Sequence, residues 1–195
     1  MELSDGALVE DCLAGRREAF TELVRRHQGR VFNLVHRMAN DRSEAADITQ
    51  DAFVRAYEKL RLYRPGGSFR NWVMAIAINL AKNRFRSQAR RRQAETRHAA
   101  LRESESEPAA APDPRCEELD VALRELPPKW RVPLVLKYME GLSYEEIASV
   151  LKIGVGAAKM RVLRGRSRLL AVVERTEHVA ASEGASHGVP EADTA

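Results

Sequence analysis

The sequence of residues 142–170, LSYEEIASVLKIGVGAAKMRVLRGRSRLL, decides the fold of the C-terminal part of the chain, because it predicts two short helices joined by a turn. Ser143 is a good N-cap for the first helix, and Glu146, three residues later, can complete a capping box. The apolar positions that follow share one helical face: Ile147, Ala148 and Leu151. Gly154 can adopt the positive φ angle that ends a helix, so we expect the turn there.

The second helix of this stretch is expected from Val155 onward, with one apolar and one basic stripe. Spacings of three and four residues place these apolar side chains together: Val155, Ala158, Val162 and Leu169. The opposite stripe holds Ala157, Met160, Arg161, Arg164 and Arg168. Residues 155–170 contain five Lys or Arg and no acid. A solvated amphipathic helix is the alternative, but the cap, the turn and the basic face together predict a helix-turn-helix.

The composition is that of an ordinary soluble protein with an uneven distribution of charge. The 195 residues include 31% charged and 44% hydrophobic residues, and the net charge is only +4. Basic residues concentrate in residues 82–92 and 159–168, whereas the central and C-terminal stretches are acidic. This asymmetry predicts two separate contacts with a polyanion rather than a uniformly basic surface.

Cysteine and histidine give no sign of a metal or cofactor site. Cys12 and Cys116 are too few and too far apart for a metal cluster or a disulfide framework, so we expect reduced thiols. His27 and His36 lie beside an apolar helical stripe and lack partner ligands nearby in the sequence. No apolar run approaches the ~20 residues of a membrane span, and no signal peptide is evident. We therefore expect a cytoplasmic protein that has no metal, no cofactor and no membrane insertion of its own.

The N-terminal half predicts a helical bundle. After a short helix capped by Ser4, residues 17–38 carry a continuous apolar stripe. A third helix, residues 41–60, should point four side chains inward: Ile48, Ala52, Ala56 and Leu60. A mixed polar and aromatic surface on the same helix is a candidate protein-docking face: Asp47, Gln50, Asp51 and Phe53. Acidic residues that only complement the helix dipole are the structural alternative.

A long helix, residues 69–92, follows a loop rich in glycine and proline. Its first half is apolar on nearly all sides and should lie centrally in the bundle. Its second half places amides and cations on one face: Asn79, Lys82, Asn83, Arg86 and Arg90. Such a face can bind both bases and phosphates, whereas a basic helix end stabilised by its dipole is the alternative. Trp72 could stack on a base, but its place in the apolar stripe favours a core position.

Residues 93–114 lose the apolar periodicity and are rich in Glu, Ser, Ala and Pro, which is typical of a linker. Fully extended, this linker spans on the order of 75 Å. We therefore expect an all-α protein of two small helical domains, residues 1–92 and 115–173, joined by a flexible acidic linker. Residues 174–195 are expected to be a disordered tail.

Four blocks in this order carry a family resemblance: DITQDAFVRAYEKL from Asp47, FRNWVMAIAINLAKNRFR from Phe69, LPPKWRVPLVLKYMEGLSYEEIA from Leu126, and the basic helix that follows. Together they resemble the extracytoplasmic-function sigma factors, small alternative specificity subunits of bacterial RNA polymerase. The likeness covers about residues 5–173, and four ordered blocks make it specific. It implies a two-domain σ2–σ4 architecture, no enzymatic activity, and a role in stress-responsive transcription initiation.

The resemblance also implies roles for the candidate residues. Asp47, Gln50, Asp51 and Phe53 match the segment that docks on the β′ clamp helices of the polymerase core, and the family also contacts the β flap. The amide and basic face of residues 79–90 matches the segment that recognises and melts the −10 promoter element. Residues 62–70 match the loop that receives a flipped base. In the −35 recognition helix, the matching cations are Lys159, Arg161, Arg164 and Arg168. An anti-sigma factor is the implied regulator.

The recognition helix departs from the family pattern at two positions. The usual Gly-Thr-Val-Lys-Ser-Arg-Leu is Gly-Ala-Ala-Lys-Met-Arg-Val here, starting at Gly156. Hydroxyl groups that face phosphates or base edges are therefore replaced at Ala157 and Met160. Arg161 and Arg164 become the stronger candidates for DNA contacts.

Two other functions compete with the initiation factor. A stand-alone dimeric helix-turn-helix regulator would need a dimerisation surface, and it would leave the basic face of residues 79–90 without a role. A sigma mimic that only binds an anti-sigma factor would be expected to lose its basic faces, and this chain keeps both. An enzyme is the least favoured class, because the sequence has no nucleophile constellation, paired acids or phosphate-binding loop.

Overall fold

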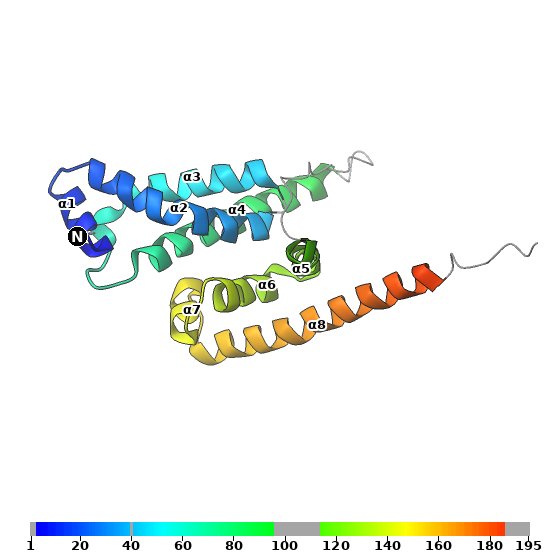
Figure 1. Cartoon of the computed structure of the whole chain (residues 1–195). Helices are drawn as coiled ribbons and strands as arrows, with labels where there is room; N and C mark the ends of the chain where they lie inside the picture. Colours follow the sequence, from blue (N-terminus) through cyan, green and yellow to red (C-terminus); the bar gives the residue numbers. More distant parts are fainter. Residues whose placement is uncertain (1–2, 40, 96–113, 186–195) are drawn as a thin grey trace, which may run out of the picture.

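The computed structural model describes residues 3–39, 41–95 and 114–185, and its regular elements in these ranges are all helical (Figure 1). The N-terminal unit comprises α1 (Asp5–Leu13), α2 (Glu18–Ala39), α3 (Arg42–Glu58), a 3₁₀ turn (Leu60–Leu62) and α4 (Phe69–Glu95). The C-terminal unit comprises α5 (Pro114–Glu125), α6 (Pro128–Leu134), a π-helical turn (Val135–Met139), α7 (Tyr144–Leu151) and α8 (Val155–Ala185). The all-α fold class is confirmed. The central part of the expected linker, residues 96–113, lies outside the described residues.

The core of the N-terminal unit lies between α2, α3 and α4, which pack side by side along most of their lengths (Figure 1). The four side chains of α3 and the following turn that were predicted to point inward are all buried: Ile48, Ala52, Ala56 and Leu60. Alanines at these contacts, together with Ala77 and Ala81 of α4, let the helices approach closely. Phe69, at the start of α4, is among the largest fully buried side chains.

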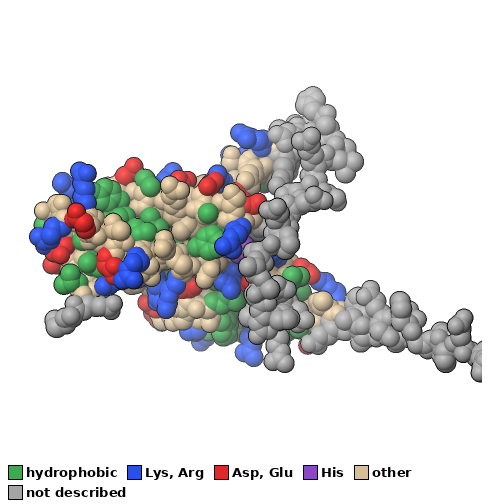
Figure 2. Space-filling view, turned by 45° about the horizontal axis from the view of Figure 1, so that its top comes forward, with side chains coloured by type: hydrophobic (Ala, Val, Ile, Leu, Met, Phe, Trp, Pro, Cys, Tyr) green, Lys and Arg blue, Asp and Glu red, His purple; other side chains and the backbone are tan. Residues whose placement is uncertain are grey.

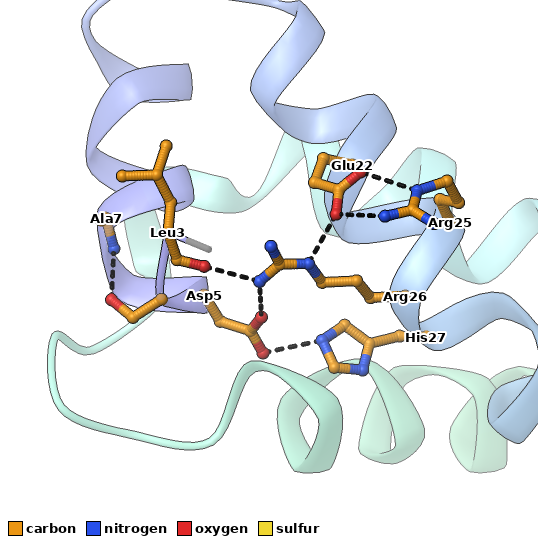
Figure 3. Close-up of polar contacts among 8 residues, drawn as sticks. Leu3, Asp5, Ala7, Glu22, Arg25, Arg26 and His27 are labelled. Carbon is orange, nitrogen blue, oxygen red and sulfur yellow. Dashed lines mark hydrogen bonds and ion pairs between the residues drawn. The ribbon is translucent and has the colours of Figure 1, made fainter. Parts of the chain in front are cut away.

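Helix α1 is tied to α2 by a polar network around Arg26 (Figure 3). The Arg26 guanidinium donates to the backbone oxygen of Leu3 at 2.7 Å and to Glu22 at 2.7 Å, and it lies 3.4 Å from Asp5. His27 Nε2 lies 2.7 Å from the other oxygen of Asp5. Hydrogen bonds from Arg25 and Arg26 lower the pKa of Glu22 to about 2. The first helix is therefore held by side chains of one turn of α2.

The C-terminal unit is built on the contact between α6 and α8. At Gly165 of α8 an added Cβ would lie 3.0 Å from the Leu134 side chain and 3.0 Å from the Trp130 backbone oxygen, so glycine is needed for this approach. Helix α6 ends at Leu134 and continues as a π-helical turn, in which Glu140 N–H donates to the Val135 carbonyl oxygen at 3.1 Å. Pro133 lies inside α6 and lacks an N–H, so it donates no backbone hydrogen bond within the helix.

Helix α8 is longer than the sequence analysis indicated. It runs from Val155 to Ala185, so residues 174–185, which were assigned to a disordered tail, are helical. The Ala- and Glu-containing sequence there has a good intrinsic helix propensity, which allows the helix to continue past its packed part. Residues 186–195 lie outside the described part of the chain.

The two units lie against each other, with α7 beneath α4 and with α5 and α6 beneath the end of α2 (Figure 1). Buried side chains of both units belong to one continuous cluster. Arg37 of α2 and Asp120 of α5 form an ion pair across the contact at 3.0 Å. The helices that carry the two basic faces are therefore held in one body.

Candidate functional site

The second half of α4 exposes the candidate nucleic-acid face. Ala77, Ile78 and Ala81 are buried against the bundle, and the helical period then turns the predicted face outward. All five of its members are exposed: Asn79, Lys82, Asn83, Arg86 and Arg90. The structure thus brings the predicted residues together on one exposed surface.

Beside the exposed face, two polar side chains of α4 contact acidic residues of α3. Arg84 lies 3.4 Å from Asp47 and 3.6 Å from Glu44, and Gln88 donates to Glu44 at 2.6 Å. These contacts link one side of α4 to the first turns of α3 and engage Arg84 in contacts within the bundle. The exposed face consequently keeps its own amides and cations available for a ligand.

The loop before α4 is a compact turn closed by aromatic rings. Gly66 has a φ angle of 82°, Gly67 N–H donates to Arg64 at 3.1 Å, and the Tyr63 hydroxyl donates to the Gly67 oxygen. The rings of Tyr63 and Phe69 have centroids 5.8 Å apart, and Trp72 lies 5.5 Å from Tyr63. Trp72 packs half-buried against the core, as its place in the apolar stripe predicted.

The helix-turn-helix begins with the predicted cap. Ser143 Oγ accepts from Glu146 N–H at 3.1 Å, and Ser143 N–H donates to the Glu146 carboxylate at 2.8 Å. The turn differs from the prediction, because Lys152 rather than Gly154 takes the positive φ angle, at 54°. The Ile153 N–H then satisfies the Ala148 carbonyl at 3.0 Å. Gly154 instead precedes α8, and its carbonyl accepts the first helical bond from Ala158 at 3.0 Å.

The start of α8 presents the predicted basic stripe. Ala158 and Val162 are fully buried, while Lys159, Arg164 and Arg168 are exposed and Arg161 is half-buried. Val155, expected on the apolar stripe, is exposed, because it is the first residue of α8 and lies before the packed turn. Arg168 lies over the Trp130 ring at 5.4 Å, which restrains its guanidinium beside the stripe.

An apolar groove lies between α2 and α3 in the N-terminal unit. Its exposed or half-buried walls include the aromatic side chains of Phe20, Phe32 and Tyr57. In Figure 2, hydrophobic side chains are exposed among charged ones on the surface of this unit. Gln50 and Phe53 line the groove. An exposed apolar groove of this kind is suited to bind a protein helix.

The predicted docking residues therefore divide between several places. Gln50 is exposed at the groove, but Phe53 is only 6% exposed, so it forms the floor rather than a projecting contact. Asp51 is exposed on a neighbouring depression that shares Val54 with the groove, and Asp47 pairs with Arg84. Phe20 of α2 was missed as a groove residue because the apolar stripe of residues 17–38 was interpreted as core packing.

A second groove, in the C-terminal unit, was also missed. It is lined by α5, α6, the π-helical turn and α8, and Tyr138 on its rim is 61% exposed. Leu119 and Met139 add exposed apolar surface to it.

Within the described ranges, no group of three or more His, Cys, Asp or Glu side chains could hold a metal ion. In the same part of the chain, no helix has the length and apolar character required to cross a bilayer.

Comparison with known proteins defines the class. Residues 23–91 match the Sigma-70 region 2 family, and residues 116–169 match Sigma-70, region 4. The first match contains α3 and nearly all of α2 and α4, and the second contains the helix-turn-helix. The two exposed basic faces thus lie in the two regions that match the sigma-70 family.

Curated relatives place the chain within that class. It is 35% identical over 176 residues to RNA polymerase sigma-H factor of Pseudomonas aeruginosa, with 85% of this chain and 91% of that protein covered. It is 33% identical over 179 residues to ECF RNA polymerase sigma-E factor of Escherichia coli K12, with 86% and 93% covered. With ECF RNA polymerase sigma factor SigE of Mycolicibacterium smegmatis the identity is 35%, and 77% of this chain matches 60% of that protein. The chain belongs to the extracytoplasmic-function sigma factors of the sigma-70 family.

Solved structures share the fold. CnrH, solved in complex with the cytosolic domain of CnrY, superposes with a TM-score of 0.65 at 26% identity, covering 88% of this chain and 97% of that one. The sigma factor RpoE, solved with the anti-sigma factor NepR from Bartonella quintana, superposes with the same TM-score at 23% identity, covering 80% of this chain and 96% of that one.

Proposed function

We propose that this sigma factor binds the RNA polymerase core and directs transcription initiation at promoters with matching −10 and −35 elements. The observation that carries this proposal is the separation of three surfaces. An amide and basic face lies on α4, a basic stripe lies on α8, and an apolar groove lies between α2 and α3. A factor that joins a protein partner to two DNA sites needs all three.

The face on α4 is the proposed −10 surface. Asn79 and Asn83 can donate and accept hydrogen bonds at base edges, while Lys82, Arg86 and Arg90 can contact phosphates. Unstacking a base costs a few kcal/mol, and a pocket for the extruded base reduces that cost. The loop of residues 62–70 lies directly before α4 and is the proposed pocket.

The stripe on α8 is the proposed −35 surface, inserted into the major groove as helix-turn-helix proteins do. Lys159, Arg161, Arg164 and Arg168 are the proposed contacts. Arg161 and Arg164 are assigned to base edges, and Arg168 is assigned to a phosphate, because Trp130 holds it beside the stripe.

The groove between α2 and α3 is the proposed site for the β′ clamp helices of the polymerase. Gln50 and Phe53 line it, and Asp51 stands on its edge as a charged contact. Asp47 is assigned a supporting role, because it pairs with Arg84 and fixes the −10 face. The exposed groove around Tyr138 is the proposed contact for the β flap.

Several further properties belong to the same proposal. The protein acts in the cytoplasm, where its polymerase is, and it acts as an initiation factor rather than as an enzyme. An anti-sigma factor controls it, which is supported by the complex of RpoE with the anti-sigma factor NepR. Stress-responsive transcription is the proposed setting.

The test is a pull-down with RNA polymerase core, followed by run-off transcription from a pool of genomic promoters. Core binding and a discrete set of new transcripts are expected. Asp51→Ala should reduce the core recovered, whereas Glu10→Ala on the exposed side of α1 should not. Core binding without any transcript would favour a DNA-free mimic. Binding of duplex DNA in the absence of core, with no core binding, would favour a dimeric regulator.

A further inference from the structure

A hollow on the exposed side of α8 has an apolar wall in the middle of the basic stripe. Met160 is 48% exposed and Leu163 is 54% exposed, so neither side chain belongs to the core. Two helical residues correspond to a rotation of about 200°, so Met160 lies opposite the buried Val162, at the centre of the exposed face. The residues that line the hollow are Trp130, Met160, Leu163, Arg164, Ser167 and Arg168.

The other neutral side chains of the hollow already have their polar groups engaged or buried. The Ser167 hydroxyl donates to the carbonyl oxygen of Leu163, in its own helix, at 3.3 Å. Trp130 is only 8% exposed, and its indole Nε1 is buried. Lys129 Nζ lies 5.1 Å and the Arg168 guanidinium 5.4 Å from the centre of the Trp130 ring, which restrains this aromatic wall. The neutral part of the hollow therefore offers a ligand apolar contact rather than hydrogen bonds.

The charge around the hollow indicates which molecule carries the apolar group. Arg164 and Arg168 belong to the lining, and residues 155–170 contain no acid, so the surface attracts a polyanion. In the major groove of DNA, the C5 methyl of thymine is the apolar group that a base pair presents, whereas the other bases present hydrogen-bonding groups. A polar base edge placed against this wall would lose its water without gaining a partner. The thymine methyl is thus the group that suits the hollow.

We propose that Met160, together with Leu163, determines sequence specificity by selecting a thymine of the −35 element through contact with its C5 methyl. This inference rests on the proposed function, in which α8 enters the major groove. Arg164 follows Met160 by four residues, a rise of about 6 Å along the helix. At 3.4 Å per base pair this is about two base pairs. The selected thymine therefore lies within about two base pairs of the position that Arg164 contacts.

The test uses the full chain bound to RNA polymerase core, with promoter duplexes in which the −35 element is randomised. Selection for binding gives the preferred −35 sequence. Each thymine of that sequence is then replaced in turn by deoxyuridine, which removes the C5 methyl and keeps the base pairing. We expect one position at which this replacement weakens binding about fourfold, the effect of returning one methyl-sized group to water.

Variants of the chain assign the effect to the hollow. Met160→Ser replaces the apolar side chain by a short polar one and should bind the thymine and deoxyuridine duplexes equally. Met160→Leu keeps an apolar side chain and should retain the preference for thymine. Leu170→Ser is the matched control, because Leu170 is 51% exposed on the same helix and does not line the hollow. Leu170→Ser should also retain the preference.

The outcomes separate this inference from the proposed function. A preferred −35 sequence whose binding depends on Arg164, but in which no deoxyuridine weakens binding, would overturn the role of Met160 and leave the proposed function intact. The same preference for thymine in native protein and in Met160→Ser would also overturn that role. Loss of core recovery in Met160→Ser, with the preference for thymine unchanged, would assign the hollow to a protein contact instead. The absence of any preferred −35 sequence would overturn both.

Discussion

The carboxylate of Glu146 accepts a hydrogen bond of 2.8 Å from the side chain of Asn71, while its other oxygen accepts the Ser143 N–H of the α7 capping box. One side chain thus caps the helix-turn-helix and joins it to α4. Glu146→Gln leaves one side-chain oxygen for these two donors and removes the charge, so it should lower the free energy of unfolding at pH 7 by about 1 kcal/mol, a typical net value for one hydrogen bond. Urea denaturation measures this, with the exposed Glu145→Gln as control.

The same contact has a defined pH dependence. The backbone of Ser143, followed by Asn71, lowers the pKa of Glu146 below its ordinary value of 4.5. The stabilisation is therefore complete above pH 4.5 and is lost as the pH falls through the lower folded pKa. The difference between native protein and Glu146→Gln should shrink in acid. A constant difference from neutral to acidic pH would contradict the role of the charge.

Glu140 should show the opposite trend. Burial raises its pKa, and this effect exceeds the opposing effect of Arg30, Arg70 and Arg37. A carboxyl whose folded pKa is raised stabilises the fold in its protonated form, and that contribution is lost as the pH rises through the folded pKa. We expect Glu140→Gln to stabilise the protein at pH 7 and to remove this dependence. Thermal unfolding at several pH values measures it, and destabilisation at pH 7 would show that the arginines dominate.

Two glycines of α8 allow a controlled test of the close contact between α6 and α8, because only one of them lies at that contact. An added Cβ at Gly165 would meet the Trp130 backbone oxygen at 3.0 Å, whereas nothing lies within 4 Å of one at Gly156. Gly165→Ala should destabilise by about 1–3 kcal/mol through overpacking. Gly156→Ala should stabilise by about 0.5–1 kcal/mol, because alanine is the better helix former. Equal effects in chemical denaturation would rule out the tight approach.

Replacing single arginine side chains should show which exposed surfaces contact DNA. Arg86→Ala and Arg164→Ala should each weaken transcription from a promoter found in the run-off pool and leave the unfolding free energy within about 0.5 kcal/mol, as for exposed residues generally. Arg91→Ala is the control, since Arg91 is exposed on α4 outside the assigned face. Equal losses in assigned and control variants would indicate a non-specific charge effect.

Features set by nearby residues were predictable from the sequence, and features set by contacts between distant segments were not. The Ser143–Glu146 box is confirmed because both partners lie within one turn, and the inward face of α3 followed from its period. The prediction that Gly154 ends α7 was wrong, because Lys152 takes the left-handed position that glycine usually occupies.

The site was predictable to the same extent. Which residues share the exposed face of α4 follows from its helical period, but the depth of Phe53 depends on how α2 covers α3. Likewise, nothing local in the sequence indicates that Asp47 pairs with Arg84, or that Glu140 is buried near three arginines of the other unit. Such contacts arise only when the helices are packed.

Helix α8 is continuous from the helix-turn-helix to Ala185, 31 residues and therefore on the order of 45 Å in length. Arg175, two-thirds of the way along, forms an ion pair with Glu125 of α5. A continuous α-helix transmits rotation and translation along its axis, because each turn is bonded to the next. A molecule that binds the far end of α8 can therefore change the orientation of Lys159 and Arg164 without contacting the DNA-facing surface.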